Sequence, residues 1–226
     1  MQPILVFDLD GTLADTAGDL VSTLNAILER EGLSGIAFDE ARAMVGAGAR
    51  ALVQRGLAAH GVKASEARLD ALFAEFLAHY EAHIADATVL YPGVAEALDR
   101  FEGAGWGFAV CTNKIEYPSI LLLTALGVAK RFRAICGKDT FAVSKPDGEA
   151  LLQTIARAGG DRRRAIMVGD SKTDIDTARN ANIPVVAVDF GYTDQPVSTF
   201  KPDRIISHFD ELWDAVEGLS EVFRVA

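Results

Sequence analysis

Cysteine, long apolar stretches and blocks of basic residues are scarce in this sequence, and each shortage excludes a class of protein. The two cysteines, Cys111 and Cys136, lie far apart and form no Cys-x-x-Cys pair, so neither a disulfide scaffold nor a zinc ribbon is available. The longest mostly apolar run, residues 120–129, is far shorter than the ~20 residues of a membrane-spanning helix. The first ten residues hold two aspartates and no basic residue, unlike an export signal. We therefore expect a cytoplasmic protein with no membrane partner.

Acidic residues outnumber basic ones, with 32 Asp and Glu against 22 Lys and Arg and a net charge of −10. This balance provides no electrostatic footprint for a nucleic-acid backbone, so we expect no nucleic-acid partner. The chain has 226 residues, half of them hydrophobic, which is enough for one large domain or two small ones. The sequence leaves open whether it is a monomer or a homodimer.

Strands and helices are predicted to alternate along most of the chain. The β-rich apolar runs are residues 4–7, 108–111, 133–136, 165–168, 185–188 and 204–206. Helical patterns lie between the later runs, at residues 118–126, 147–158 and 171–180, and near the C-terminus from Phe209 onward. This alternation predicts an α/β fold, a doubly wound parallel sheet with helices on both faces.

The interval between the first two predicted strands is too long for one βαβ unit, which takes about 30 residues. Helical patterns fill it, at residues 19–31, 39–54 and 65–84. We therefore predict a helical cap domain at residues 16–86, inserted into an α/β core of residues 1–15 and 87–226. Hinges are expected at residues 15–18 and 86–93, where small and polar residues gather.

Two acidic residues follow the first predicted strand where it ends. Asp8 and Asp10 flank a leucine and precede Gly11, and alternate side chains of an extended chain face the same way. Two like charges on one side require a cation or a proton. A simple Asp-Gly turn would also explain this pair, so the other strand ends have to decide its role.

Polar side chains also lie at later strand ends. Thr112 and Asn113 follow the second predicted strand, and they carry a hydroxyl and an amide that suit phosphate oxygens. Asp170 and Asp174 follow the fourth strand, and Lys145 precedes a predicted helix. Each alone also fits a turn, a helix cap or a surface lysine. Because the carboxyl ends of parallel strands meet at one edge, we expect these groups to share one crevice.

Counting charges restricts the chemistry of this crevice. Asp8, Asp10, Asp170 and Asp174 contribute four negative charges against one positive charge from Lys145. A divalent cation and a protonated Asp10 would bring the crevice to neutrality, and an all-oxygen set of hard ligands selects Mg²⁺. A carboxylate nucleophile, a second carboxylate for proton transfer, and Lys with Thr to hold an oxyanion predict phosphoryl transfer through an aspartyl phosphate.

The order and placement of these motifs resemble those of the haloacid dehalogenase-like hydrolases. The motifs read Asp8-x-Asp10-Gly11-Thr12, Thr112-Asn113, Lys145-Pro146 and Gly169-Asp170-Ser171-x-x-Asp174. The resemblance covers essentially the whole chain, and it implies a phosphatase because the dehalogenase branch lacks an acid at the position of Asp10. The inserted helices resemble the cap of the family's first cap class.

The resemblance also implies a role for each matched residue. Asp8 is then the nucleophile, and Asp10 is the general acid and afterwards the base. Thr112 and Lys145 then clamp the phosphoryl group. Mg²⁺ would be bound by the Asp8 side chain, the Asp10 backbone carbonyl and Asp170, with Asp174 in support.

Within the family, the chain is most similar to phosphoglycolate phosphatases. The similarity rests on Thr112-Asn113-Lys114, residues 45–52 and Gly191-Tyr192, whereas residues 145–148 read Lys-Pro-Asp-Gly in place of the usual Lys-Pro-His-Pro. We predict 2-phosphoglycolate as the substrate. Arg50, a cation after a Gly-x-Gly turn, is the candidate that binds the substrate's carboxylate, unless it is only a solvent-facing helix residue. Lys114 is a second candidate for substrate specificity.

Other readings of these motifs are a phosphatase for a different small phosphate, a pyrophosphatase or a sugar-phosphate mutase. From a different class, a phospho-receiver domain also surrounds an aspartate with acidic residues, Thr, Lys and Mg²⁺, although receivers are small single domains without a helical insert. A ligand-binding module without activity is the remaining alternative. In each case the partner is a small phosphorylated molecule or group.

Overall fold

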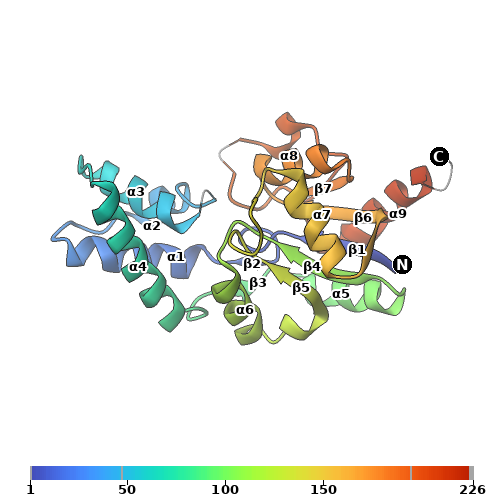
Figure 1. Ribbon diagram of the computed structural model, residues 1–226, viewed down its shortest axis with the longest axis horizontal. Helices are drawn as coiled ribbons and strands as arrows, with labels where there is room; N and C mark the ends of the chain where they lie inside the picture. The colour runs from blue at the N-terminus through green and yellow to red at the C-terminus, as the bar shows by residue number, and fades with distance from the viewer. Residues whose placement is uncertain (1, 47, 194, 224–226) are drawn as a thin grey trace.

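The computed structural model describes residues 2–46, 48–193 and 195–223, and it contains a six-stranded parallel sheet in the order β5-β4-β1-β6-β7-β8 (Figure 1). Its strands are β1 (Gln2–Phe7), β4 (Gly107–Cys111), β5 (Phe132–Cys136), β6 (Gly160–Gly169), β7 (Val185–Val188) and β8 (Arg204–Ile206). Every neighbouring pair in this order is parallel. The doubly wound parallel sheet predicted from the sequence is confirmed, because each predicted apolar run forms a strand.

Helices cover both faces of the sheet (Figure 1). They are α5 (Val94–Gly103), α6 (Glu116–Ala125), α7 (Gly148–Arg157), α8 (Lys172–Ala181) and α9 (Leu212–Phe223), with short 3₁₀ helices η1 (Ala129–Arg131), η2 (Val197–Phe200) and η3 (Phe209–Glu211). In β1, Leu5 and Phe7 belong to the core on the side of α5, α6 and α9, whereas Ile4 and Val6 belong to the core on the side of α7 and α8. Successive side chains of a strand point to opposite faces, so a strand buried on both sides must be apolar at every position.

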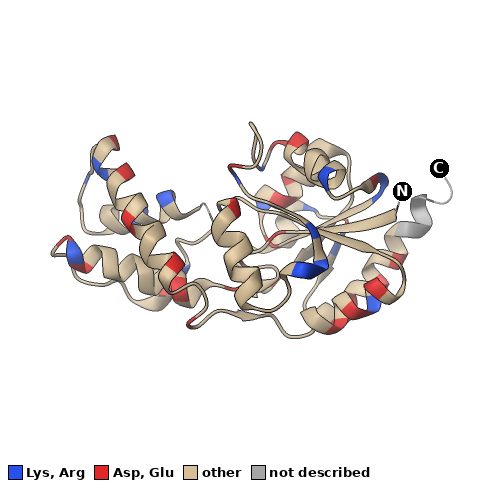
Figure 2. Ribbon diagram, turned by 60° about the horizontal axis from the view of Figure 1, so that its bottom comes forward, with Lys and Arg blue, Asp and Glu red and all other residues tan. Residues whose placement is uncertain are grey.

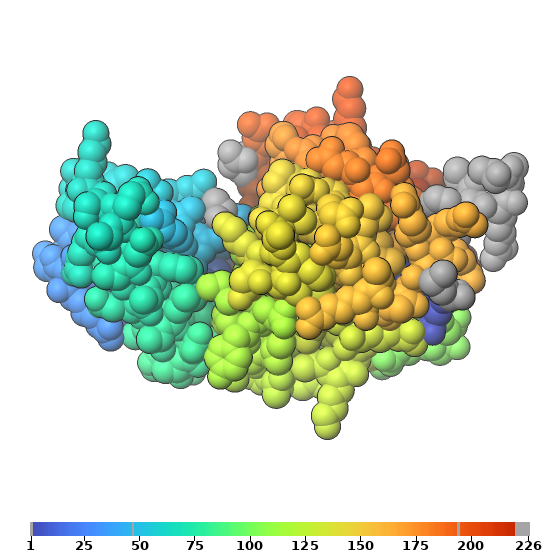
Figure 3. Space-filling model, viewed as in Figure 1, coloured from blue at the N-terminus to red at the C-terminus, as the bar shows by residue number. Residues whose placement is uncertain are grey.

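Four further helices, α1 (Ala17–Arg30), α2 (Phe38–Arg42), α3 (Ala49–Ala59) and α4 (Glu66–Ala82), stand beside the sheet rather than on it. Figure 3 shows these helices as a distinct lobe, joined to the rest of the molecule across a narrower region. The short strands β2 (Ala14–Asp15) and β3 (Val89–Leu90) pair antiparallel where the chain leaves for these helices and returns from them. The two segments that connect the sheet with these helices therefore lie side by side. The predicted domain limits, at residues 15/16 and 86/87, stay a prediction.

A buried carboxylate ties these two connecting segments together. Asp19, in the first turn of α1, accepts hydrogen bonds from the backbone N–H groups of Ala87 and Thr88, each at 2.9 Å, and from the Thr88 hydroxyl at 2.6 Å. Gly18 approaches the same segment so closely that an added Cβ would lie 3.0 Å from the Ala87 Cβ. These contacts fall within or next to the two segments predicted as hinges.

The structure corrects the prediction of one helix over residues 39–54. Two helices, α2 and α3, replace it. Gly46 and Gly48 lie between them with φ angles of 110° and 88°, a backbone region that favours glycine and that a right-handed helix does not use. Helix α2 has already ended at Arg42, and Gly48 is the N-cap of α3, so the two glycines prevent one continuous helix over these residues.

Two other helices differ from the sequence prediction. Helix α5 was missed, although Val94, Leu98 and Phe101 recur at helical spacing and are buried. The C-terminal helix begins at Leu212, and Phe209, expected on its first turn, lies in η3 instead.

Figure 2 shows charged residues mainly on helices and loops. Strands β1, β4 and β7 contain none, whereas β6 carries four charged residues ahead of its buried, apolar second half. This distribution follows from the burial of the sheet on both faces, since an unpaired charge is costly in such a place. Among the described residues, no helix combines the length and the apolar character that crossing a membrane requires.

Candidate active site

The carboxyl ends of three adjacent strands bring the predicted site residues together. Asp8 follows β1, Thr112 follows β4 and Asp170 follows β6, and the sheet order places these strands side by side as β4-β1-β6. A hydrogen bond of 2.9 Å from the Asp8 N–H to the Val168 carbonyl extends the pairing of β1 with β6 to the first site residue. Adjacent strands are about 4.8 Å apart, so the three loops share one crevice, as expected from the sequence.

Lys145 lies between two of the carboxylates. Its Nζ is 2.9 Å from Asp8 Oδ2 and 2.6 Å from Asp174 Oδ1, and the lysine is buried. The other Asp8 oxygen, Oδ1, accepts a 2.7 Å hydrogen bond from the Leu9 N–H. The side chain of Asp8 is thereby held in one orientation, with an ammonium group beside it.

Asp174 is held by donors on both of its oxygens. Besides Lys145 on Oδ1, its Oδ2 accepts hydrogen bonds from the N–H groups of Asp170 and Ser171 at 3.2 and 3.0 Å and from the Ser171 hydroxyl at 2.6 Å. Ser171 in turn caps the N-terminus of α8. Both oxygens of Asp174 therefore already have partners within the protein, and its supporting role at a metal stays a prediction.

Asp170 is positioned by groups outside the motif that contains it. Its Oδ1 accepts a 3.0 Å hydrogen bond from the Thr12 hydroxyl, and its Oδ2 accepts one of 2.7 Å from the Tyr192 N–H. Gly11 and Gly191 allow this approach, because an added Cβ would lie 2.6 and 2.3 Å from Asp170 Oδ2. Two glycines and a turn threonine are therefore required to bring this carboxylate close to Asp8.

Burial and mutual repulsion raise the pKa values of two of these carboxyl groups. The pKa of Asp8 is raised to about 6, chiefly by burial and against the attraction of Lys145. The pKa of Asp170 is raised to about 8 by burial and by the neighbouring charges of Asp174 and Asp8. The pKa of the Lys145 ammonium is raised by Asp174 and Asp8 against the effect of burial, so it stays protonated beside them.

The structure gives Asp10 a partner that the charge count from the sequence omitted. The Nζ of Lys114 lies 3.1 Å from Asp10 Oδ1 and donates to the Tyr80 hydroxyl at 2.9 Å. Four carboxylates therefore face two ammonium groups, Lys114 and Lys145, instead of one. The charge count therefore no longer supplies an argument for a protonated Asp10, and its role as general acid stays a prediction.

Thr112 and Asn113 differ in what they offer to a ligand. The Thr112 oxygen accepts a 3.2 Å hydrogen bond from the Lys114 N–H, so its hydroxyl proton is available to a phosphoryl oxygen. The Asn113 amide donates to the Lys145 carbonyl at 3.1 Å, which fixes the loop of the lysine. The buried Oδ1 of Asn113 has no hydrogen-bond partner within the described structure. Both residues line the crevice, and the phosphate-binding role expected for them stays a prediction.

The departure from the usual third motif has a structural reason. Asp147 caps the N-terminus of α7 by accepting a 2.9 Å hydrogen bond from the Glu149 N–H. Gly148 packs against α8, where an added Cβ would lie 2.5 Å from the Ala181 nitrogen. The Asp-Gly pair therefore supports the contact between α7 and α8 and leaves Lys145 in the site.

The crevice is a cavity of about 270 Å³ between the sheet and the four helices at its side. Asp8, Asp10 and Asp170 line it from the strand ends. Leu52 of α3 and Phe76 of α4 line it from the opposite side. The cavity thus has acidic, hydrogen-bonding groups on the side of the strand ends and apolar side chains on the side of α3 and α4. Such a cavity suits a small phosphorylated molecule.

Arg50 lines this cavity, but its guanidinium already has two acidic partners. It lies 2.6 Å from Glu66 Oε2 and 2.9 Å from Asp70 Oδ1, both on α4. The residue pattern does not indicate these ion pairs, because they join side chains of two different helices. The carboxylate-binding role of Arg50 stays a prediction.

Tyr80 and Tyr192 take part in the site without having been singled out for it by their sequence patterns. Tyr80 fits the apolar stripe of its helix, and nothing in that stripe reveals its contact with Lys114. The Tyr192 hydroxyl donates to Asp15 at 2.6 Å and accepts from the Thr16 and Ala17 N–H groups at 2.6 and 2.9 Å. Tyr192 thus connects the Asp170 carboxylate with the start of α1.

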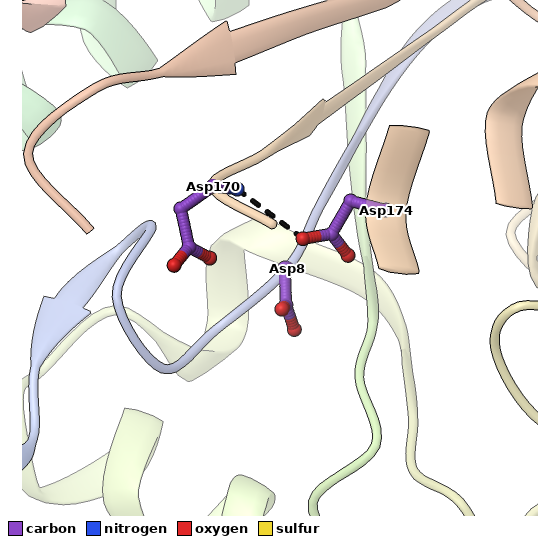
Figure 4. Close-up of side chains that lie close together, drawn as sticks. All are labelled: Asp8, Asp170 and Asp174. Atoms are coloured by element: carbon purple, nitrogen blue, oxygen red, sulfur yellow. Dashed lines mark hydrogen bonds between the residues drawn. The ribbon is translucent and has the colours of Figure 1, made fainter. Parts of the chain in front are cut away.

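The acidic cluster fits a bound cation. Asp8, Asp170 and Asp174 offer carboxylate oxygens that lie within 4.8 Å of one another, and Figure 4 shows their carboxylates converging from β1, the end of β6 and α8. The raised pKa values of Asp8 and Asp170 mean that their charged forms are poorly compensated by the protein alone. Hard oxygen donors of this kind favour Mg²⁺ or a similar ion.

Comparisons with known proteins agree with this geometry. A family model described as haloacid dehalogenase-like hydrolase matches residues 5–188. A phosphoglycolate phosphatase of Mesorhizobium japonicum is 52% identical over 227 residues, which cover 100% of this chain and 98% of the relative. One of Agrobacterium fabrum is 45% identical over 216 residues, or 96% of this chain and 93% of the relative.

Solved structures give the same result for the fold. The crystal structure of a predicted phosphoglycolate phosphatase from Haemophilus somnus superposes with a TM-score of 0.86 at 27% sequence identity. The superposition covers 94% of this chain and 97% of that one. All the candidate site residues lie within residues 5–188, the range that the family model matches.

Proposed function

The chain belongs to the haloacid dehalogenase-like hydrolases and is a phosphoric monoester hydrolase of their phosphoglycolate phosphatase-like group, and we propose from this premise that it hydrolyses 2-phosphoglycolate with Asp8 as the nucleophile. The observation that carries the proposal is the placement of Asp8 at the floor of the cavity, 2.9 Å from the buried Lys145 ammonium. A fixed carboxylate beside a permanent positive charge is suited to attack an anionic phosphoryl group.

In the proposed reaction an Asp8 oxygen attacks phosphorus, the bond to the leaving-group oxygen breaks, and an aspartyl phosphate forms. The Thr112 hydroxyl and the Lys145 ammonium bind the phosphoryl oxygens as charge moves onto them. Water then attacks the aspartyl phosphate, which releases phosphate and restores Asp8.

Asp10 would supply and remove the protons of both steps. It lines the cavity together with Asp8, and Lys114 holds its side chain at 3.1 Å. As a general acid it protonates the leaving alcohol, and as the resulting base it takes a proton from the attacking water. Lys114 also contacts Tyr80 of α4, so closure of the cap and placement of the acid are proposed to be linked.

Asp8, the Asp10 backbone carbonyl and Asp170 are proposed to hold Mg²⁺, with Asp174 in support. When bound, Mg²⁺ neutralises carboxylate charge and polarises the phosphoryl group. Residues 16–86 are proposed to act as the cap domain over a core of residues 1–15 and 87–226. The apolar side chains of α3 and α4 would exclude bulk water from the aspartyl phosphate.

We propose that the protein acts in the cytoplasm, as a monomer or homodimer and without a nucleic-acid partner.

Initial rates on a panel of phosphate esters with Mg²⁺ test the proposed substrate. We expect the highest kcat/KM for 2-phosphoglycolate, ahead of sugar phosphates and pyrophosphate. A higher kcat/KM for pyrophosphate or a sugar phosphate would identify another phosphatase, and an isomerised sugar phosphate would identify a mutase. A phosphorylated protein that does not turn over would point to a receiver-like module.

The raised pKa values predict how Mg²⁺ binding depends on pH. The Asp8 and Asp170 carboxyls have pKa values of about 6 and 8 in the folded protein, against 3.8 as the ordinary value. Between about pH 4 and pH 8 these two carboxyls bind more protons in the folded state than in the unfolded state. In the absence of metal, the stability that the two protonated carboxyls contribute is therefore complete below about pH 4 and is lost as the pH rises to 8. Mg²⁺ competes with these protons. We therefore expect Mg²⁺ to raise the melting temperature more at pH 8 than at pH 5.

Differential scanning fluorimetry at both pH values, with and without Mg²⁺, measures this difference. Asp170→Asn removes one of the two titrating groups and should reduce the pH dependence of the Mg²⁺ effect. An equal Mg²⁺-induced shift at pH 5 and pH 8 in the unaltered protein would contradict the proposed metal site.

A further inference from the structure

The basic side chains that line the cavity differ in whether an acid already pairs with them. Arg50 pairs with Glu66 and Asp70 of α4, and Lys114 pairs with Asp10. Lys138 also lines the cavity, and no carboxylate of the described residues lies within ion-pair distance of its ammonium group. Lys138 is therefore the lining cation whose charge the protein itself leaves uncompensated within the part of the chain that the structure describes.

The backbone that carries Lys138 is firmly placed. The Lys138 N–H donates to the Lys114 carbonyl at 2.9 Å, and an added Cβ on Gly137 would lie 2.2 Å from the Glu116 nitrogen. The neighbouring acid, Asp139, accepts a 2.8 Å hydrogen bond from the Glu116 N–H at the start of α6. The loop after β5 is thus packed onto the loop after β4, and its acid is used there instead of neutralising Lys138.

The sheet order sets the distance between Lys138 and the nucleophile. Lys138 follows β5, and Asp8 follows β1, with β4 between these strands. Two strand spacings amount to about 10 Å, which leaves room between the two residues for the leaving group of a substrate whose phosphorus lies against Asp8. A lysine side chain is long enough to span part of that distance, and Lys138 is among the residues that line the cavity.

The acids of the site make a cation at this place significant. Asp8, Asp10 and Asp170 line the same cavity and repel a second anionic group on the substrate. A leaving group with a carboxylate therefore needs a positive charge on the side away from the phosphoryl group. Arg50 would have to give up two ion pairs to provide it, whereas Lys138 would not.

We propose that Lys138 determines substrate specificity by binding the carboxylate of the leaving group, an inference that rests on the proposed hydrolysis of 2-phosphoglycolate. Lys138 contacts the part of the substrate that does not react, so it contributes to binding in the ground state and the transition state alike. Its loss should therefore raise KM for carboxylate substrates more than it lowers kcat.

The test compares two substrates that differ in charge and little in size, 2-phosphoglycolate and 2-hydroxyethyl phosphate. We expect Lys138→Met to lower the ratio of their kcat/KM values about tenfold, the effect of one charge-assisted hydrogen bond. Lys130→Met is the matched control, since Lys130 lies in η1, before β5 rather than after it, and is absent from the cavity lining. This control should keep the ratio of the unaltered protein.

A charge reversal makes the test sharper. Lys138→Glu should lower the ratio further and should improve hydrolysis of 2-aminoethyl phosphate relative to 2-phosphoglycolate. Lys138 is exposed, so both variants are expected to fold, and their melting temperatures verify this. If the unaltered protein does not prefer 2-phosphoglycolate, the proposed function fails. If it does and Lys138→Met keeps the ratio, the inference about Lys138 is overturned while the proposed function stands.

Discussion

Replacing Asp8 with asparagine is expected to reduce kcat by at least about a thousandfold while the protein still folds. The amide that replaces the carboxylate is not a nucleophile and cannot form an acyl phosphate. Its oxygen can still accept the 2.7 Å hydrogen bond from the Leu9 N–H. The substitution also removes one charge from a crowded set of carboxylates, which offsets the loss of the contact with Lys145. We therefore expect little change in the melting temperature.

Steady-state rates on 2-phosphoglycolate, together with circular dichroism and a melting curve, measure both halves of this prediction. Asp176→Asn is the matched control, because Asp176 lies on α8 outside the cavity and pairs there with Lys172 and Arg179. The control should retain the activity of the unaltered protein. Phosphate release by a folded Asp8→Asn protein at more than a tenth of the original rate would remove Asp8 from the nucleophile's role.

Removal of divalent cations is expected to have an effect of similar size. Asp8, Asp10, Asp170 and Asp174 face only the two ammonium groups of Lys114 and Lys145 in the described site, and a phosphate monoester brings further negative charge. Without a cation the site repels this substrate. Treatment with EDTA should therefore abolish hydrolysis, and excess Mg²⁺ should restore it.

Rates before chelation, after chelation and after Mg²⁺ addition test the reversibility on one sample. The melting temperature of the chelated protein distinguishes loss of the metal from loss of the fold, and a cooperative transition is expected without metal. Full activity in EDTA would refute the charge argument on which the metal site is proposed.

Much of the fold was predictable because it depends on local patterns. Each of the six strands contains a short apolar run, and burial on both faces makes such runs conspicuous. Helices α1 and α4 follow their apolar stripes to within three residues at either end. The prediction failed at residues 39–54, where an apolar pattern continues past Gly46 and Gly48. There the φ angles of two glycines, which a pattern of apolar residues does not report, interrupt the helix.

The candidate site was predictable to the extent that it follows from sheet topology. Parallel strands all end at one edge, so polar residues placed after β1, β4 and β6 must meet. The contacts that cross between separate segments were not predictable in this way. The Lys114 pair with Asp10, the Tyr192 bonds to Asp170 and Asp15, and the Arg50 ion pairs each join residues far apart in the chain.

The sequence by itself determined the α/β architecture, the set of acids with Lys145 at the strand ends, and the resemblance to the hydrolase family, because these depend on residue type and order. Only the tertiary structure decided which cations are already paired and which one is available to a ligand. An ion pair depends on the distance between side chains from different elements, and the linear order of residues does not specify that distance. Arg50 and Lys138 are both basic residues in the sequence. Only the folded chain distinguishes the paired guanidinium of Arg50 from the ammonium of Lys138, which has no acidic partner among the described residues.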